Sequence, residues 1–242
     1  MNLPHKIKSK TSPLGAQQLS VKKKNNGLES ASSAITLTIQ SLKQLKDKAY
    51  SEKWSYTDTR FNALYPLSIQ ALARCHWTPL SIAQKAATFL AGEGNVRILD
   101  IGSGVGKFCL AAAIHTPNAM YCGVEQRKSL IDFAEAARKS LQLENVRFMH
   151  GNFTQLDFKK YDHFYFYNAF YENLDGTDKI DDSIDYSGEL YNYYNRYLFK
   201  QLQQKPKGTR ICTLCSLENE IPPDFHVVKA EMNELLKFWI KI

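Results

Sequence analysis

The chain has 242 residues, of which 44% are apolar and 23% charged, and its formal net charge is +7. This composition supplies enough apolar residues for a hydrophobic core, and it excludes the class of chains that are too polar to form one. No apolar run reaches the roughly 18 residues that cross a bilayer, and the first ten residues lack the apolar segment of a secretory signal.

The five cysteines are odd in number and lie among apolar residues, which predicts reduced thiols and a cytoplasmic protein. Cys212 and Cys215 have C-x-x-C spacing, but no second pair or histidine cluster accompanies them. We therefore expect core packing at these cysteines and no metal site in the protein.

The positive charge is concentrated at the start of the chain. Residues 1–24 contain six lysines and no acid, whereas the rest has a net charge of +1. Residues 1–30 show no apolar period, so we predict a flexible basic tail. Such a tail is usually solvated, but it could also bind nucleic acid without sequence preference.

Residues 31–93 are predicted to form a helical segment. One helix is expected over 34–50, and two more over 65–94. In the last of these, Thr78 is the expected N-cap before Pro79, and Gly92 the expected end.

Residues 94–242 alternate between strand and helix patterns, which predicts a doubly wound α/β domain. The strands are expected at 96–102, 119–125, 145–152, 161–170, 208–216, 225–232 and 235–242, the last two as a hairpin. The helices are expected at 107–115, 129–143 and 189–204. The short link between the third and fourth strands leaves room only for turns.

A glycine-rich loop follows the first of these strands. A P-loop would need glycine and a hydroxyl where the chain has Ile101 and Phe108. A dinucleotide loop would need a third glycine at Lys107, and the carboxylate of Asp100 would repel a pyrophosphate. The loop therefore suits a ligand without phosphate that carries a positive charge or an amine.

The sequence "DIGSGVG" at 100–106 resembles the first motif of the class I methyltransferases, an acidic residue followed by x-G-x-G-x-G. The resemblance implies a seven-stranded, mostly parallel sheet with a reversed last strand, and S-adenosylmethionine as cofactor. Asp100 and the loop residues would hold its methionine part and ribose. Glu125 follows Asp100 by 25 residues and would accept both ribose hydroxyls. The implied cofactor-binding residues are Asp100, Gly102, Ser103, Gly104, Gly106, Glu125, Gln126, Asn152, Phe153 and Asn168.

The same resemblance places the catalytic residues after the fourth strand, in "YNAFYEN". Asn168 would orient an amine hydrogen, and Tyr171 would border the substrate path. Amino methyltransferases that act on adenine, cytosine or glutamine carry [DN]-P-P-[FY] here, but Ala169 and Phe170 replace both prolines. Locally, "GSGVG", "GVE" and Asn168–Ala169–Phe170 also look like the non-SET lysine methyltransferases.

Seven acids follow this motif, at 172, 175, 178, 181, 182, 185 and 189, opposed only by Lys179. A negative lip on the cleft attracts a cationic acceptor and repels a phosphate backbone. We therefore favour a protein amine as acceptor. The basic tail supports an alternative acceptor, an amino group of a nucleic acid (tRNA, rRNA or DNA). A second alternative is a protein that binds S-adenosylmethionine without catalysis.

Overall fold

A computed structural model describes residues 57–242 except 93 and 217. Contacts within the chain define two units, 1–53 and 54–242, and all described residues belong to the second. The predicted tail at 1–30 and the predicted helix at 34–50 lie outside the described residues.

One seven-stranded sheet forms the centre of the domain, with strand order β3-β2-β1-β4-β5-β7-β6. β7 is antiparallel to both of its neighbours, and the other pairings are parallel. The strands are β1 (Arg97–Ile101), β2 (Met120–Glu125), β3 (Val146–His150), β4 (His163–Tyr167), β5 (Arg210–Leu214), β6 (Phe225–Glu231) and β7 (Leu236–Lys241). The predicted fold class, with its reversed last strand, is confirmed.

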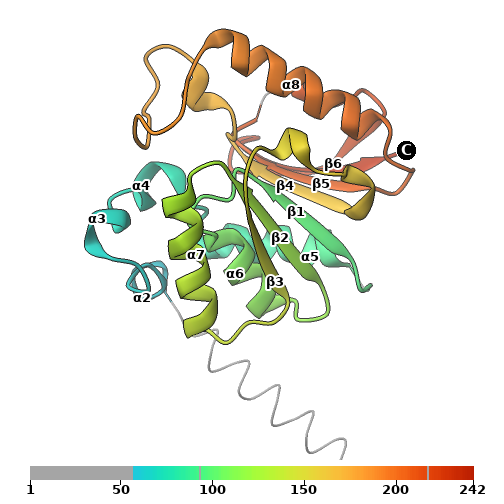
Figure 1. Ribbon diagram of the computed structural model, residues 1–242. Coiled ribbons are helices and arrows are strands. Elements are labelled where there is room, and N and C mark those ends of the chain that lie inside the picture. Colours follow the sequence, from blue (N-terminus) through green and yellow to red (C-terminus); the bar gives the residue numbers. More distant parts are fainter. Residues whose placement is uncertain (1–56, 93, 217) are drawn as a thin grey trace, which may run out of the picture. The chain divides into compact units, whose positions relative to one another are not determined.

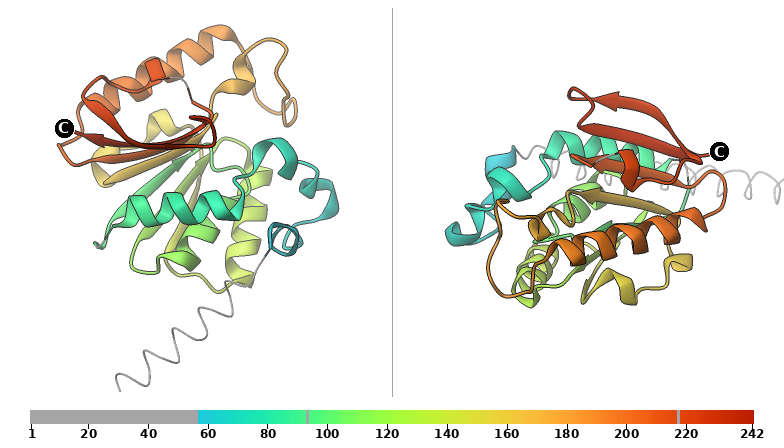
Figure 2. Two further views of the ribbon diagram at one scale, coloured as in Figure 1. Left: turned by 180° about the vertical axis from the view of Figure 1, so that it is seen from behind. Right: turned by 90° about the horizontal axis from the view of Figure 1, so that it is seen from above.

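Helices cover both faces of the sheet. α5, α6 and α7 lie on one face and α8 on the other (Figures 1 and 2). The long helices are α5 (Leu80–Ala91), α6 (Lys107–His115), α7 (Lys128–Ser140) and α8 (Gly188–Gln203). Short turns η1 (Phe153–Gln155) and η2 (Phe158–Lys160) connect β3 to β4, as the short link predicts.

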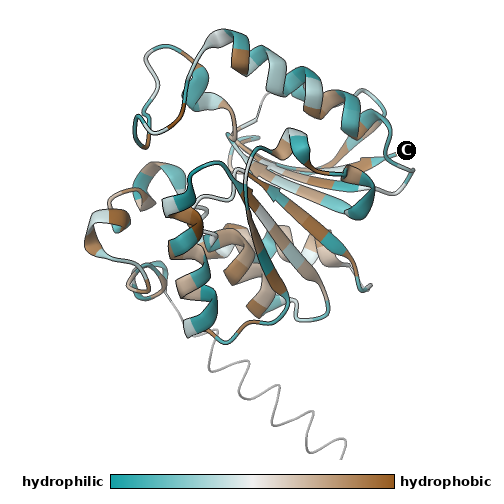
Figure 3. Ribbon diagram, in the orientation of Figure 1, coloured by the Kyte–Doolittle hydropathy of each residue, from teal (hydrophilic) through white to brown (hydrophobic). Residues whose placement is uncertain are grey.

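The apolar residues gather between these layers (Figure 3). α6 is buried from Lys107 to Ile114, whereas α7 and α8 bury only one stripe each. Parallel strands covered on both faces are apolar throughout, which explains the continuous apolar run at β1. On α7 the stripe includes Ile131, and Phe133 is only half-buried.

The chain before α5 is more broken than its sequence pattern predicts. Between residue 65 and α5 it forms two short helices, α3 (Leu67–Gln70) and α4 (Ala73–His76), where we expected one, and a further short helix, α2 (Asp58–Asn62), precedes them. Gly92, with φ +53, ends α5 as predicted.

The expected N-cap of α5 was wrong. The Thr78 hydroxyl instead hydrogen-bonds the buried Tyr165 hydroxyl at 2.8 Å. The Asp58 carboxylate accepts from Leu80 N–H at 3.1 Å and also pairs with Lys107. A side chain 22 residues away therefore caps this helix, and it ties α2 to α5 and α6.

Candidate active site

A cavity that is open to solvent, with an empty volume of about 1190 Å³, lies at the carboxyl ends of β1, β2 and β4. Open α/β sheets bind ligands in this place, where neighbouring connections leave to opposite faces of the sheet. Seven of the predicted site residues line it: Gly102, Gly104, Glu125, Gln126, Phe153, Asn168 and Tyr171.

The glycine loop lets backbone form the floor of this cavity. Gly102 and Gly104 have φ of +74° and +54°, values that side chains rarely tolerate. A Cβ at Gly102 would lie 3.3 Å from that of Ala169, whereas nothing lies within 4 Å of a Cβ built on Gly104. The loop can therefore approach the chain after β4 on one side and a ligand on the other.

Glu125, at the end of β2, places a buried carboxylate on the cavity wall. Its oxygens accept from Gly104 N–H at 3.1 Å and from Arg127 N–H at 2.9 Å. Burial raises the pKa of Glu125, and these N–H groups and the Arg127 charge oppose that shift. A carboxylate oxygen can accept more than one hydrogen bond, so both oxygens can still receive a donor from a ligand.

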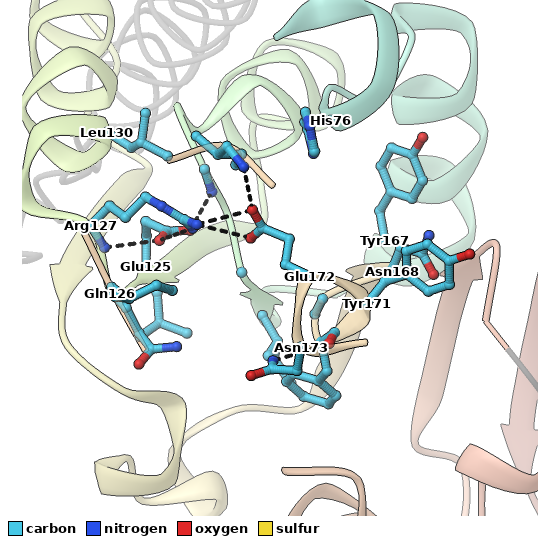
Figure 4. A pocket seen from close by; sticks show the side chains of 18 of the residues that line it. His76, Glu125, Gln126, Arg127, Leu130, Tyr167, Asn168, Tyr171, Glu172 and Asn173 are labelled. Atoms are coloured by element: carbon cyan, nitrogen blue, oxygen red, sulfur yellow. Dashed lines mark hydrogen bonds and ion pairs between the residues drawn. The ribbon is translucent and has the colours of Figure 1, made fainter. Parts of the chain in front are cut away.

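Arg127 joins Glu125 to the segment between β4 and α8 (Figure 4). Its guanidinium donates to both oxygens of Glu172, at 3.0 and 3.1 Å, and to Asp181 at 3.0 Å. The guanidinium also contacts the Tyr186 hydroxyl, and this hydroxyl donates to the Asp181 carbonyl at 2.6 Å. We call residues 172–186 the strap; Arg127 holds it against the cavity.

The segment before α5 forms another wall of the cavity. Leu72, Cys75, His76 and Trp77 line it. The Tyr167 hydroxyl donates to the Cys75 carbonyl at 2.9 Å, which links this segment to the end of β4. The Tyr65 hydroxyl likewise donates to the carbonyl of Val105 in the glycine loop, at 3.0 Å.

β4 ends at Tyr167, three residues earlier than expected, because Asn168 has φ +50. Asparagine tolerates this left-handed conformation better than most residues. Asn168 and Tyr171 lie across the cavity from Arg127 (Figure 4), and the side chain of Tyr171 is 47% exposed. The turn therefore presents an amide and a phenol to the cavity.

Four of the predicted cofactor residues lie outside the cavity lining: Asp100, Ser103, Gly106 and Asn152. The Ser103 side chain packs over Gly123, and Gly106 leaves room for the ring of Phe148. The amide of Asn152 donates to Gln126 at 3.1 Å and to Tyr194 at 2.8 Å, and its oxygen caps η1. Asn152 thus positions Gln126, and a direct contact with the cofactor stays a prediction.

Asp100 is buried under the loop, where Cys109 donates to it at 3.5 Å. Burial raises the pKa of Asp100 to about 8, and the charge of Glu125 adds to the shift. The repulsion that we expected from Asp100 near neutral pH is therefore small. The carboxylates that line the cavity are those of Glu125, Glu172 and Asp178.

Arg127 was missed from the sequence. A base two residues after the strand-ending acid, with several acids downstream, was the available signal. That signal does not indicate which of those acids contact Arg127 in the folded chain. The structure pairs Arg127 with Glu172 and Asp181, two of the seven acids of the expected lip, so its single positive charge offsets part of their negative charge.

Residues 93–239 match the family described as "Methyltransferase domain". This match covers more than half of the chain, and the order of the sheet agrees with it. The chain belongs to this methyltransferase family, and its fold is that of the class I, S-adenosylmethionine-dependent enzymes.

Similarity to individual proteins is local. The chain is 46% identical over 54 residues to a tRNA (guanine-N(7)-)-methyltransferase of Synechococcus sp. (strain JA-3-3Ab), covering 22% of this chain and 23% of that protein. It is 33% identical over 70 residues to the release factor glutamine methyltransferase of Buchnera aphidicola, covering 29% and 25%. It spans about a quarter of the length of these curated relatives.

Among solved structures, TrmN from Thermus thermophilus superposes with a TM-score of 0.50 at 17% identity, covering 71% of this chain and 51% of that one. This likeness concerns the fold alone. Within the described residues no helix is long and apolar enough to span a membrane, and no three His, Cys, Asp or Glu side chains are grouped as metal ligands.

The cavity fits S-adenosylmethionine in its chemistry. Glu125 offers acceptors for a ribose diol, and Gly104 leaves open space over bare backbone. Val124, Leu130 and Phe153 give an apolar wall for a flat base. A pyrophosphate would instead meet the carboxylates of Glu125 and Glu172.

Proposed function

We propose that this protein transfers a methyl group from S-adenosylmethionine to a nitrogen of a nucleic-acid base. The assignment of the cofactor rests on the Glu125 carboxylate, which lies on the wall of a cavity whose floor is formed by Gly102 and Gly104. The cofactor would supply an electrophilic methyl group on a sulfonium sulfur.

The residues of the cavity would act mainly by positioning. In methyl transfer the acceptor nitrogen forms a bond to the methyl carbon while the carbon–sulfur bond breaks and its electron pair stays on sulfur. The reacting atoms must be held about 3–3.5 Å apart and in line. Glu125 would fix the ribose, and the Asn168 amide oxygen would hold an N–H of the acceptor or stabilise the positive charge that forms there.

Two observations favour a nucleic-acid acceptor over the protein amine that the sequence suggested. First, the acidic lip is weaker than its formal charge, since the single positive charge of Arg127 offsets part of the negative charge of Glu172 and Asp181. Second, several of the curated relatives that match locally are named tRNA guanine-N(7) methyltransferases.

Residues 57–242 carry 21 bases and 21 acids, so the entire net charge of +7 lies in residues 1–56. A basic segment of this kind would add salt-sensitive attraction to phosphate.

A protein amine or amide remains the second candidate. Asp178 lines the cavity, and Asp175, Asp182 and Asp185 lie exposed on the same strap. The local match to a release factor glutamine methyltransferase favours the same class of acceptor.

Methyl transfer to a cell extract tests the proposal. Extract is incubated with the purified protein and S-adenosylmethionine labelled in the methyl group, and then digested with nuclease or protease. We expect label that nuclease releases and protease does not. Label released only by protease would establish the second candidate, and no label above that of a Glu125→Ala control would refute catalysis on the extract's macromolecules.

A further inference from the structure

Positive charge is concentrated along α8 and the turn that follows it. Residues 191–208 contain four bases and no acid, whereas residues 57–242 as a whole have no net charge. α8 lies on the face of the sheet opposite to α5, α6 and α7 (Figure 1). One surface of an otherwise balanced domain is therefore basic, and the four bases are Arg196, Lys200, Lys205 and Lys207.

The helical period turns most of these side chains to solvent. The stripe of α8 that packs on the sheet is Tyr194, Leu198 and Leu202. Residues three or four apart on the opposite side of a helix share one outward face. On α8 that face is exposed throughout, and it consists of Tyr193, Arg196, Lys200 and Gln203. Lys207 follows in the turn after the helix and is exposed as well.

A further pair of lysines adjoins α8. The Lys205 ammonium donates to the carbonyls of Phe158 and Tyr161, at 3.1 and 2.6 Å, so η2 packs beside the end of α8. η2 carries Lys159 and Lys160, and both are exposed. We call the exposed residues of both elements the basic surface: Tyr193, Arg196, Lys200, Gln203 and Lys207, with Lys159 and Lys160.

The bases of this surface are not compensated by acids. Within the described part of the chain, Lys159, Lys160, Arg196, Lys200 and Lys207 form no ion pair. The Arg196 guanidinium donates to a carbonyl of its own helix, that of Asn192, at 3.1 Å. Lysines elsewhere on the surface do pair with acids, for example Lys85 and Lys229 with Glu231. Uncompensated cations gathered on one face attract a polyanion.

Aromatic and amide side chains accompany these charges. Tyr193 is 49% exposed and begins the outward face of α8. An open groove beside Arg196 and Lys200 is also lined by Asn192, Asn195 and Phe199. Unpaired bases stack on exposed rings, and amides can hydrogen-bond sugars and phosphates. The groove contains one carboxylate, Glu220, which accepts from the Tyr191 hydroxyl at 2.8 Å.

We propose that the basic surface binds the phosphate backbone of a single-stranded segment of the nucleic acid whose base is methylated. The nature of this partner rests on the proposed function. α8 lines the cofactor cavity through Tyr194, on the other side of the helix. A helix with its side chains is about 10–12 Å across, so one polynucleotide can reach the surface and the cavity together. The exposed Glu189 and the acids of the strap precede Tyr193, so we expect phosphate contacts from Tyr193 towards the end of α8.

RNA binding tests the surface apart from catalysis. The full-length protein, saturated with S-adenosylhomocysteine, is titrated with a fluorescent oligouridylate between about 50 and 200 mM salt, and anisotropy gives the affinity. Each phosphate contact of a single strand contributes about 0.7 to the slope of log affinity against log salt. The double variant Arg196→Gln/Lys200→Gln should lower that slope by about 1.4 and weaken binding about tenfold or more at about 0.1 M salt.

A matched control has the same loss of charge on α7, on the other face of the sheet. Lys128 and Lys139 are exposed there, and Lys128→Gln/Lys139→Gln should leave the slope nearly unchanged. Residues 1–56 are the same in every variant, so their attraction to RNA cancels in the comparison. Calorimetry with S-adenosylhomocysteine should give equal cofactor affinity in all variants, because glutamine is tolerated on an exposed helix face.

A further variant separates stacking from charge. Tyr193→Leu keeps an apolar side chain but loses the ring, and stacking contributes about 1–3 kcal/mol per base. It should weaken binding about fivefold or more with an unchanged salt slope. Unchanged binding would remove Tyr193 from the surface.

Equal losses in the α7 and α8 double variants would overturn the proposal, because net charge alone would then explain binding. Unchanged RNA binding in the α8 variant would overturn it too, even if that variant no longer sediments with phosphatidylserine vesicles, since the surface would then serve an anionic membrane. If the α8 variant loses RNA binding but the extract experiment labels only protein, the proposed function fails and the RNA-binding surface stands. If nucleic acid is labelled and the α8 variant binds RNA normally, the surface fails and the proposed function stands.

Discussion

Replacing Arg127 by methionine should destabilise the protein by about 3 kcal/mol near neutral pH. The Arg127 side chain is 3% exposed, and its partners Glu125 and Glu172 are 7% and 18% exposed. Breaking a buried pair by removing one partner costs about 3–5 kcal/mol, because the remaining charge is left without compensation. The Asp181 partner, 40% exposed, adds less than about 1 kcal/mol.

Urea unfolding of the unaltered protein and the variant measures this loss. Lys128→Met is the matched control. Lys128 is the next residue along the chain, and its ion pair with Asp132 is about 60% exposed on both sides. Its removal should cost at most about 0.5 kcal/mol.

A double variant tests the assignment to charge. Arg127→Met with Glu172→Gln leaves fewer uncompensated charges, so it should lose less than the two single losses added together. Additive losses would mean that Arg127 stabilises the strap by packing alone. A loss below about 1 kcal/mol in Arg127→Met would refute the reasoning entirely.

The pH dependence gives an independent check. Burial raises the pKa of Glu125, and the charge of Arg127 opposes that shift. In the Arg127→Met variant the pKa of Glu125 should therefore be higher still. The folded variant then takes up a proton as pH falls, and the uncompensated charge disappears. The loss caused by Arg127→Met should therefore shrink as the pH is lowered from neutral.

Three further predictions concern the cavity. Glu125→Ala should weaken S-adenosylhomocysteine binding at least tenfold in calorimetry, since it removes the acceptor of the ribose hydroxyls; unchanged affinity would remove that assignment. Asn168→Ala should lower turnover about 10²-fold while cofactor affinity stays within a few-fold, and full activity would place the chemistry elsewhere. Asp100→Asn should make the melting temperature less sensitive to pH. The pKa of Asp100 is raised from 3.8 to about 8, so ionisation destabilises the unaltered protein as pH rises through this range. Parallel pH profiles of the two proteins would contradict that reasoning.

The sheet and its flanking helices were predictable because their signals are local. Apolar runs ending in glycine or an acid predicted β1 and β2, and the helical period predicted α7 and α8. The α5 cap was not predictable. Thr78 before Pro79 is a local capping signal, but Tyr165 takes its hydroxyl and Asp58 caps the helix. Both Tyr165 and Asp58 are distant from the start of α5 in the sequence, so no local sequence pattern reveals these contacts.

The candidate site divides in the same way. The motif spacing predicted Gly102, Gly104 and Glu125, which meet at one cavity because the ends of neighbouring parallel strands do. Arg127 and the wall before α5 depend on how the strap and the short helices fold back. Ser103 and Asn152 carry suitable groups at suitable positions, but their side chains turn to Gly123 and Tyr194. A spacing rule places a Cα, and it does not choose a rotamer.

Charge is the property that changes most between the sequence and the fold. Counted along the chain, Asp100 favours a cofactor that carries a positive charge or an amine, and the seven acids after β4 favour a cationic acceptor. In the fold, burial raises the pKa of Asp100 to about 8, and the single charge of Arg127 offsets part of the negative charge of Glu172 and Asp181. The negative charge that an incoming acceptor meets therefore depends on which carboxylates the fold compensates, more than on the number of acids in the sequence.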